Sequence, residues 1–542
     1  METRRILHRY LPGIFLLALI VSGQSFEVLY NFPATATPYG GLVQDGAGNI
    51  YGTTFNGGNN DRGGIFRMTS NGVFSTLYSF GSTPNDGQSP FAGLCLAPDG
   101  NLYGTTTTGG LFGMGTLFVI TPAGTLTTLF PFRGTRQRST DADGANPYGR
   151  LTVSADGRYL LGTTRGGTLD FVGGCLFQLD LTTQNIYTLA AFGGAGGTAP
   201  MGEVIPVTGS SRLLTTTSIG GAVNRGTVAA IDSYSPTSLF TFDGTTGDNP
   251  QGGVILASDG FVYGTTYAGG ANNFGTAFKM TISGSLVWSY SFDRFTGGAI
   301  RPSAALVQGN DGNFYGTTAG GASGLTGTIF KVTPAGSLTN IVDFRNTTAS
   351  SPMGGPLLQA ADGRFYGVAS AGGQFGGGVL FRFDIPPAIV RQPVSVTWPV
   401  GGSVTLSATL GGSGPSTYQW QKNSQNIPQA TSSNLVLNPL QFSDAADYRL
   451  IVSNVVGSVV SDAATLTVIP RPAFQSIALA GGNISTIWST VAGQKYELQS
   501  TSSPDLGNWS AITAITNATG PTVTSSGPLA PPFKYFRVRW VP

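Results

Sequence analysis

Short apolar runs alternate with glycine-rich turns through most of this chain, and the alternation repeats about every 50 residues. In the first repeat, an apolar run at 41–44 leads through Asp45-Gly46 into a second run at 50–54, and further runs follow at 65–69 and 73–80. Asp-Gly between two apolar runs is typical of a β-hairpin. The pattern therefore predicts four antiparallel strands in each repeat.

The second run of each repeat carries the sequence Tyr-Gly-Thr-Thr or a variant of it. Its seven copies begin 49–58 residues apart, at Tyr51, Tyr103, Leu161, Leu214, Tyr263, Tyr315 and Tyr366. A period of this length indicates units that bury their apolar faces only by stacking on their neighbours. Seven such units of four strands predict an all-β fold with a seven-bladed β-propeller over residues 26–385. We expect the motif itself to serve the scaffold rather than a ligand.

The last repeat has no fourth apolar run, because Pro386-Pro387 follow closely after its third run. A run of the missing kind lies at 26–32, ahead of the first repeat. We therefore expect residues 26–32 to complete the seventh sheet and to close the array, which removes its free strand edges.

One resemblance rests on positions that the repeats share. The sixth repeat carries apolar residues at 306–308, Asp311-Gly312, the motif at 315–318, Gly320-Gly321 and an apolar run at 329–332. In these positions the unit resembles the bacterial GloVer tandem repeat of the choice-of-anchor protein family, over roughly residues 26–384. The resemblance implies an exported protein and attaches no activity to the repeat. The family's carboxy-terminal sorting anchor has no hydrophobic counterpart at 536–542.

Two further modules are predicted after the repeats. Residues 386–469 resemble an immunoglobulin domain, because Trp420 lies 14 residues after Leu406 and Tyr448 lies two residues before Leu450. These spacings suit the core tryptophan and the tyrosine corner of that fold, with leucine at both cysteine positions, so we expect a domain without a disulfide. Residues 470–542 predict a small β-sandwich-like domain with aromatic residues in its core.

Residues 1–23 match a secretory signal peptide, because three arginines precede an apolar run at 14–21 and then Ser22-Gly23. An uncleaved anchor is the alternative, although the run is short for crossing a bilayer. Cleavage would change the formal net charge from +2 to zero. A neutral chain offers no basic surface for nucleic acid. We expect a secreted or outer-surface protein with no transmembrane segment beyond the signal peptide.

Few residues suit catalysis or metal binding. The one histidine, His8, lies in the predicted signal peptide, which excludes Ser-His-Asp triads and histidine metal sites from the mature chain. Asp141-Ala142-Asp143-Gly144 resembles the start of a calcium loop, but its twelfth position is Thr152 instead of glutamate. We therefore expect no metal, no cofactor and no catalytic residue. Paired aspartates remain an alternative.

The two cysteines lie in apolar runs of different repeats. Cys95 stands between two leucines, and Cys175 directly precedes Leu176-Phe177. We expect two buried thiols, with a disulfide in the exported chain as the alternative.

Candidate binding residues lie where the repeats differ. The connection into the first strand of each repeat carries a Pro-x-Gly-like sequence, and in a propeller these connections share one face. Position x is occupied in turn by Tyr39, Phe91, Tyr148, Met201, Gln251, Ser303 and Met353. Such a ring suits a sugar or a peptide by stacking and hydrogen bonding. Further candidates come from the charged connection into the third repeat, with a solvated loop as the alternative: Arg133, Arg136, Arg138, Asp141 and Asp143.

The sequence thus favours a secreted or cell-surface protein that binds an extracellular glycan or protein without catalysis. One alternative is a polysaccharide lyase or hydrolase that uses aspartates of the propeller channel. The other is a structural component of the cell envelope.

Overall fold

The computed structural model describes residues 18–21, 24–134, 144–167, 173–232, 235–294, 298–321, 326–344, 349–352, 355–504, 507–528 and 535–542. This part of the chain is all-β, and its helical segments are two short 3-10 turns, Gly194–Gly196 and Phe442–Asp444. The chain divides into two compact units, Met1–Pro386 with Gly411–Pro415, and Pro387–Leu410 with Ser416–Pro542. No helix among the described residues is both long and apolar enough to span a bilayer.

The first unit contains seven antiparallel sheets of four or five strands, one for each repeat. The first three sheets contain β3 (Val43–Gln44), β4 (Ile50–Thr54), β5 (Gly64–Met68) and β6 (Phe74–Ser79); β8 (Cys95–Leu96), β9 (Leu102–Thr106), β11 (Thr116–Ile120) and β12 (Leu126–Pro131); and β14 (Thr152–Val153), β15 (Tyr159–Gly166), β16 (Cys175–Asp180) and β17 (Ile186–Ala191). The next three contain β19 (Ile205–Pro206), β20 (Leu213–Ile219), β21 (Thr227–Asp232) and β22 (Ser235–Thr241); β23 (Ile255–Leu256), β24 (Val262–Thr266), β25 (Thr276–Met280) and β26 (Leu286–Ser291); and β28 (Val307–Gln308), β29 (Phe314–Gly321), β30 (Thr328–Val332) and β31 (Leu338–Asp343). Each of these six repeats therefore forms the four strands that its apolar pattern predicts.

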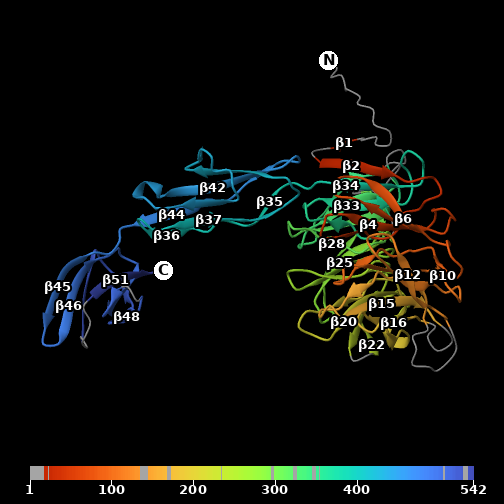
Figure 1. Ribbon diagram of the computed structural model, residues 1–542, viewed down its shortest axis with the longest axis horizontal. Coiled ribbons are helices and arrows are strands. Elements are labelled where there is room, and N and C mark those ends of the chain that lie inside the picture. The colour runs from red at the N-terminus through yellow and green to blue at the C-terminus, as the bar shows by residue number, and fades with distance from the viewer. Residues whose placement is uncertain are drawn as a thin grey trace, which may run out of the picture. The chain divides into compact units, whose positions relative to one another are not determined.

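The seventh sheet takes a strand from the other end of the repeat region. Its own strands are β32 (Leu358–Gln359), β33 (Phe365–Ala369) and β34 (Val379–Phe383). The fourth position, next to β34, is filled by β2 (Gln24–Asn31), and Phe26 lies opposite Phe383. An outermost strand, β1 (Ala18–Val21), pairs with β2 and falls within the predicted signal peptide. Figure 1 shows β2 beside β34, with β4 and β6 of the first sheet close by.

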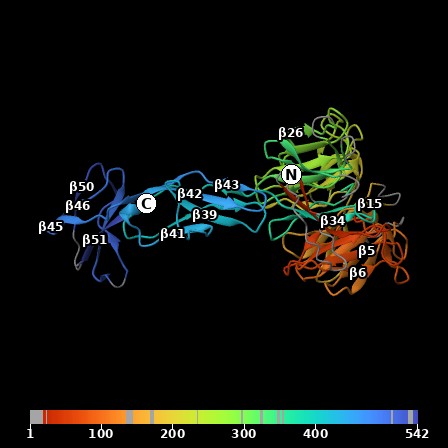
Figure 2. The same ribbon diagram turned by 90° about the horizontal axis from the view of Figure 1, so that it is seen from above.

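Apolar clusters join each sheet to the next one along the chain. The second and third strands of the first repeat are buried on both faces. Ile50 and Phe66 pack with the seventh sheet, while Tyr51 and Ile65 pack with the second. This alternation follows from the two-residue period of a strand. Seven clusters connect the sheets in order, and one of them contains residues of both the seventh and the first sheets, among them Leu380 of the seventh and Phe66 of the first. A second view shows β34 close to β5 and β6 (Figure 2).

The tyrosine and the glycine of the repeated motif make contacts within the scaffold. The Tyr51 hydroxyl donates a hydrogen bond to the Asp45 carboxylate at 2.8 Å, and four other repeats have the same Tyr-to-Asp bond within the hairpin. Burial, followed by this hydrogen bond, raises the pKa of Tyr51. The motif glycine lies against the phenylalanine of the third strand, and a Cβ at Gly52 would come within 2.4 Å of the Phe66 ring.

In the fourth repeat a larger residue replaces this glycine and a smaller residue replaces this phenylalanine. Thr215 stands at the glycine position, and its partner in the third strand is Ala229. Both residues are completely buried. The larger residue on one strand is thus matched by the smaller residue on the other, which keeps the packing filled.

Both cysteines are buried and form no disulfide, as we expect from their apolar surroundings. Cys175 lies within hydrogen-bond distance of the second motif threonine of its repeat, with Thr164 Oγ1 3.3 Å from Cys175 Sγ. In four other repeats a threonine at this position pairs with the motif threonine. Cys175 therefore takes the place of a scaffold hydroxyl.

The second unit begins with an immunoglobulin-like sandwich. Trp420, Leu406 and Leu450 are buried in one core, and the Tyr448 hydroxyl donates to the Asp444 carbonyl at 2.8 Å, which is the predicted tyrosine corner. Its strands are β35 (Ala388–Arg391), β36 (Val396–Pro399), β37 (Val404–Ser407), β38 (Thr409–Gly411), β39 (Thr417–Lys422), β40 (Gln425–Asn426), β41 (Asn434–Leu437), β42 (Ala446–Ser453), β43 (Ser458–Val460) and β44 (Ala464–Ile469).

Two small sheets follow in the carboxy-terminal segment, and Trp488 and Tyr496 are fully buried there. One sheet contains β45 (Phe474–Ala480), β46 (Asn483–Ser489) and β50 (Thr522–Pro528), and the other contains β47 (Lys495–Thr501), β48 (Ser510–Ala511), β49 (Thr516–Asn517) and β51 (Tyr535–Val541). These two residues form the aromatic core that the sequence predicts for this segment, whereas Tyr535, expected in the same core, is 46% exposed.

Candidate functional site

The segments that lead into the repeats meet around one cavity in the first unit. We call residues 39–41, 91–93, 148–150, 201–203, 251–253, 303–305 and 353–355 the hub segments, one for each repeat. Six of the seven variable candidates line a single cavity of about 300 Å³: Tyr39, Phe91, Tyr148, Met201, Gln251 and Ser303. Met353 lies outside the described residues. The variable positions thus converge, although they are spread over more than 260 residues of sequence.

A scaffold threonine holds four of the hub segments in place, namely 91–93, 201–203, 251–253 and 303–305. The first motif threonine of one repeat donates to a carbonyl in the hub segment of the next repeat, as Thr53 does to Ala92 at 3.1 Å and Thr265 to Ala304 at 3.0 Å. The same bond links Thr216 to Gly252 at 2.8 Å. The regular motif therefore positions the residues that vary.

Neighbouring hub segments also pack backbone against backbone. A Cβ on Gly93 would lie 2.1 Å from the Gly41 carbonyl oxygen, and a Cβ on Gly355 would lie 2.0 Å from the Gly41 nitrogen. Only a residue without a Cβ allows this approach. The close contacts of Gly41 with Gly93 and Gly355 bring the first, second and seventh repeats together at the cavity.

The backbone just before the hub segments adopts an unfavourable conformation. Six residues that directly precede the hub proline have a positive φ although none is glycine: Ser89, Asn146, Ala199, Asn249, Arg301 and Ser351, with φ between 53° and 61°. This left-handed conformation is costly for residues with a side chain and is retained mainly where the surrounding structure requires it. Short strands that pair with the second strand of the repeat, or with its continuation, hold three of these turns: β13 (Ala145–Pro147), β18 (Thr198–Pro200) and β27 (Ala299–Pro302). A similar pair precedes the second hub segment, β7 (Gly87–Gln88) with β10 (Thr108–Gly109).

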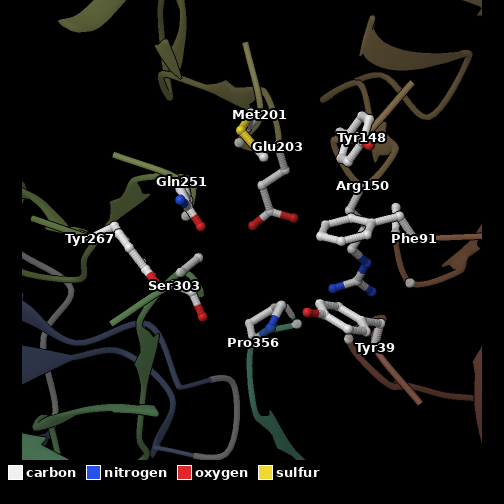
Figure 3. A pocket seen from close by; sticks show the side chains of 18 residues that line it. Tyr39, Phe91, Tyr148, Arg150, Met201, Glu203, Gln251, Tyr267, Ser303 and Pro356 are labelled. Atoms are coloured by element: carbon white, nitrogen blue, oxygen red, sulfur yellow. The ribbon is translucent and has the colours of Figure 1, made fainter. Parts of the chain in front are cut away.

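Aromatic rings form a continuous arc on one side of the cavity. The ring centroids of Tyr39 and Phe91 are 4.9 Å apart, and those of Phe91 and Tyr148 are 4.8 Å apart. Phe55 supports the arc with centroids about 6 Å from Tyr39 and Phe91. All three lining rings are partly exposed, so that they present apolar surface to the cavity. Figure 3 shows them facing Gln251, Tyr267 and Ser303 across the open space.

Polar groups complete the lining. Burial raises the pKa of Tyr39 above its ordinary value, and the nearby Tyr267 raises it further. The Tyr39 hydroxyl is therefore protonated at neutral pH and can both donate and accept a hydrogen bond. Arg150 and Glu203 also line the cavity, and their charged ends extend into it (Figure 3). An aromatic wall with hydroxyl, amide and charged groups opposite is suited to binding a polar ligand that has one apolar face.

The charged candidates near the third repeat lie elsewhere. Arg133 places its guanidinium carbon 5.4 Å from the centre of the Phe112 ring and does not line the cavity. Arg136, Arg138, Asp141 and Asp143 lie outside the described residues. Among the residues that are described, no group of three or more His, Cys, Asp or Glu side chains is arranged to hold a metal ion.

Three lining residues were not singled out from the sequence. Arg150 and Glu203 stand two residues after the variable position, and Tyr267 directly follows the motif of the fifth repeat. A comparison of the repeats at these two positions would have found them, because the residue after the motif also varies, from Phe55 to Arg165 and Tyr267.

Comparison with known proteins matches both parts of the chain. The Gloeobacter/Verrucomicrobia repeat family model matches residues 14–229 and 204–394, and an immunoglobulin domain model matches residues 386–454. Mouse Contactin-2 is 34% identical over 110 residues, which is 18% of this chain and only 10% of Contactin-2. Tandem immunoglobulin repeats of Dlar are 18% identical and cover 29% of this chain and 89% of that structure, with a TM-score of 0.16.

A titin fragment, I67–I69 of the I-band, is 11% identical and covers 49% of this chain and 83% of the fragment, with a TM-score of 0.17. The family match spans residues 14–394, well over half of the sequence. The chain belongs to the Gloeobacter/Verrucomicrobia repeat family and carries an immunoglobulin domain after its repeats.

Proposed function

We propose that the seven sheets of residues 26–385 form a closed seven-bladed β-propeller that displays one binding cavity. Two observations support closure: β2 pairs with β34, and one apolar cluster joins the seventh sheet to the first. In this proposal, residues 1–23 are a signal peptide, and the modules at 386–469 and 470–542 act as a spacer or as an attachment.

The proposed activity is binding of an extracellular saccharide at the cell surface or outside the cell. One observation carries it: the positions that differ between the repeats line the cavity, whereas the positions that the repeats share hold the scaffold. Variation confined to one cavity is expected of a recognition site on a repeated scaffold. The aromatic arc of Tyr39, Phe91 and Tyr148 suits the apolar face of a sugar ring. The immunoglobulin domain and the family to which the chain belongs support a location outside the cell.

A polysaccharide lyase or hydrolase is the alternative that the same cavity allows. Glycoside hydrolysis ordinarily uses two carboxylates on either side of the bond. Among the described residues that line the cavity, Glu203 is the one carboxylate. Binding therefore accounts for the lining better than two-carboxylate hydrolysis does, and release of reducing ends or unsaturated products is assayed with the same ligands.

We expect the mature full-length chain to bind at least one saccharide in a panel of envelope polysaccharides and their oligosaccharides, measured by calorimetry. Tyr39→Ala and Phe91→Ala are each expected to weaken that binding about tenfold, because stacking on an aromatic ring contributes on the order of 1 kcal/mol beyond the area that it buries. Tyr187→Ala is the matched control, since Tyr187 is exposed on β17 and does not line the cavity.

Two results would count against the proposal. One is the absence of binding to every saccharide of the panel by a folded chain. The other is binding that Tyr187→Ala weakens as much as Tyr39→Ala does. Thermal melting of each variant separates loss of the ligand from loss of the fold.

A further inference from the structure

The third residue of the hub segments singles out two adjacent repeats. Five repeats carry a small residue there: Gly41, Gly93, Gly253, Ala305 and Gly355. The third and fourth repeats instead carry Arg150 and Glu203. The scaffold therefore does not require a side chain at this position. The scaffold does not explain why two neighbouring repeats carry residues of opposite charge here.

Arg150 and Glu203 do not form an ion pair with each other. Arg150 Nε donates to the Leu94 carbonyl at 3.0 Å, which fixes the guanidinium plane and leaves its terminal nitrogens directed at the cavity. No described residue, Arg150 included, lies within hydrogen-bond or ion-pair distance of the Glu203 carboxylate. Both side chains are partly buried. A partly buried charged group that has no ion-pair partner is stabilised by a ligand that supplies a hydrogen-bond partner.

The charges of the cavity lining offset each other. Arg150 and Glu203 are the charged residues among the described lining. Burial raises the pKa of the nearby Cys95 thiol, and of the two charges Arg150 lowers it while Glu203 raises it. Arg165 and Arg301 lie against the rings of Tyr148 and Tyr267 and do not line the cavity. A ligand with a single charge would therefore meet one attraction and one repulsion.

We propose that the cavity takes a neutral saccharide whose adjacent hydroxyl groups bridge Arg150 and Glu203. Arg150 donates to the oxygen of one hydroxyl, and Glu203 accepts the hydrogen of its neighbour. A hydroxyl can act in both ways, so a vicinal pair matches one fixed donor and one fixed acceptor. The ring of the same sugar packs on Tyr39 and Phe91. This inference rests on the proposed saccharide binding and adds the class of sugar and the two residues that select it.

The test compares neutral and acidic ligands of equal length. Hexasaccharides of glucose, galactose and mannose are titrated into the mature full-length chain beside a hexasaccharide of galacturonic acid. Each titration is done at about 0.01 M and about 1 M NaCl, where the screening length is about 30 Å and about 3 Å. We expect a neutral hexasaccharide to bind, with a Kd that changes less than about twofold between the two salt concentrations.

Variants then assign the two residues. Arg150→Ala and Glu203→Ala are each expected to weaken the neutral ligand about tenfold or more, because hydrogen bonds to charged groups contribute about 1.5–3 kcal/mol. The double variant is expected to lose less than the sum of the two, since one diol contacts both residues. Arg133→Gln is the matched control, because Arg133 does not line the cavity. Both alanine variants should fold, since other repeats carry glycine or alanine at this position.

Two outcomes separate this inference from the proposed function. Binding confined to the galacturonic acid ligand and weakened strongly by salt would overturn the neutral-sugar assignment while leaving saccharide binding in place. Neutral binding that neither alanine variant affects would overturn the roles of Arg150 and Glu203. Failure of all four ligands, together with the wider panel, would contradict the proposed function itself.

Discussion

A chain that begins at residue 33 is expected to unfold at a much lower denaturant concentration than one that begins at residue 24. The missing segment contributes Phe26, Val28 and Phe32, all less than 7% exposed. Full burial of such side chains contributes about 1.5–3 kcal/mol each. We therefore expect the free energy of unfolding of the repeat region to fall by about 5 kcal/mol or more. Both chains lack β1, so the comparison isolates β2.

Loss of this segment also exposes an edge and breaks an ion pair. β34 would lose its partner strand, and Arg382 would lose Glu27, whose carboxylate oxygen lies 2.6 Å from the arginine Nη2. An unpaired edge is a site for pairing with another chain. Addition of a synthetic peptide of residues 24–32 is expected to restore the midpoint of the shortened chain. An unchanged midpoint in the shortened chain would show that β2 does not close the array.

The second large effect is expected at the glycine and phenylalanine that face each other in the fifth repeat. A Cβ on Gly264 would lie 2.6 Å from the Phe278 ring, so Gly264→Thr overfills the core. Phe278→Ala leaves a cavity and is expected to cost about 3–5 kcal/mol. The double variant reproduces the Thr215–Ala229 pair of the fourth repeat. We expect it to be less destabilised than the sum of the single variants, by about 1–3 kcal/mol.

A second double variant serves as the control for this cycle. Gly264→Thr combined with Phe118→Ala places the two changes in repeats that share no apolar cluster, because Phe118 faces Gly104 in the second repeat. The free energy of unfolding of every variant in both cycles is measured by urea titration. The destabilisation of this second double variant is expected to equal the sum of those of its two single variants. If the destabilisation of both double variants equalled the sum of their single variants, the proposed exchange of a large and a small residue between the two strands would be wrong.

Much of the scaffold could be predicted from the sequence because the same pattern of strands and turns recurs in each repeat. A single Asp-Gly turn is weak evidence, but the same turn before Tyr51, Tyr103 and Tyr315 fixes the hairpin and its register in repeat after repeat. The absence of a fourth apolar run near Asp384 and its presence at 26–32 likewise predict the pairing of β2 with β34.

The cavity could be predicted only in part. Comparison of the repeats at one position identified Tyr39, Phe91 and Tyr148, but it overlooked the position two residues later, where Arg150 and Glu203 stand. The repeat pattern predicts that these connections share one face, but it does not determine how closely they approach each other. Their convergence depends on the threonine bonds and on the close backbone packing of the hub segments, which are tertiary contacts.

The charged cluster illustrates the same limit. Arg133 is predicted as a candidate because charges are dense around it, but density of charge in a loop does not determine where the loop points. In the structure its guanidinium lies over Phe112, and the cavity is lined instead by the shorter hub segments of the neighbouring repeats.

Diffraction from crystals of the mature full-length chain soaked with its best-binding neutral hexasaccharide tests the central claim most directly. The account predicts a sugar ring against Tyr39 and Phe91, with adjacent hydroxyls at Arg150 and Glu203. A saccharide bound elsewhere on the protein, with only solvent among these four side chains, would contradict it.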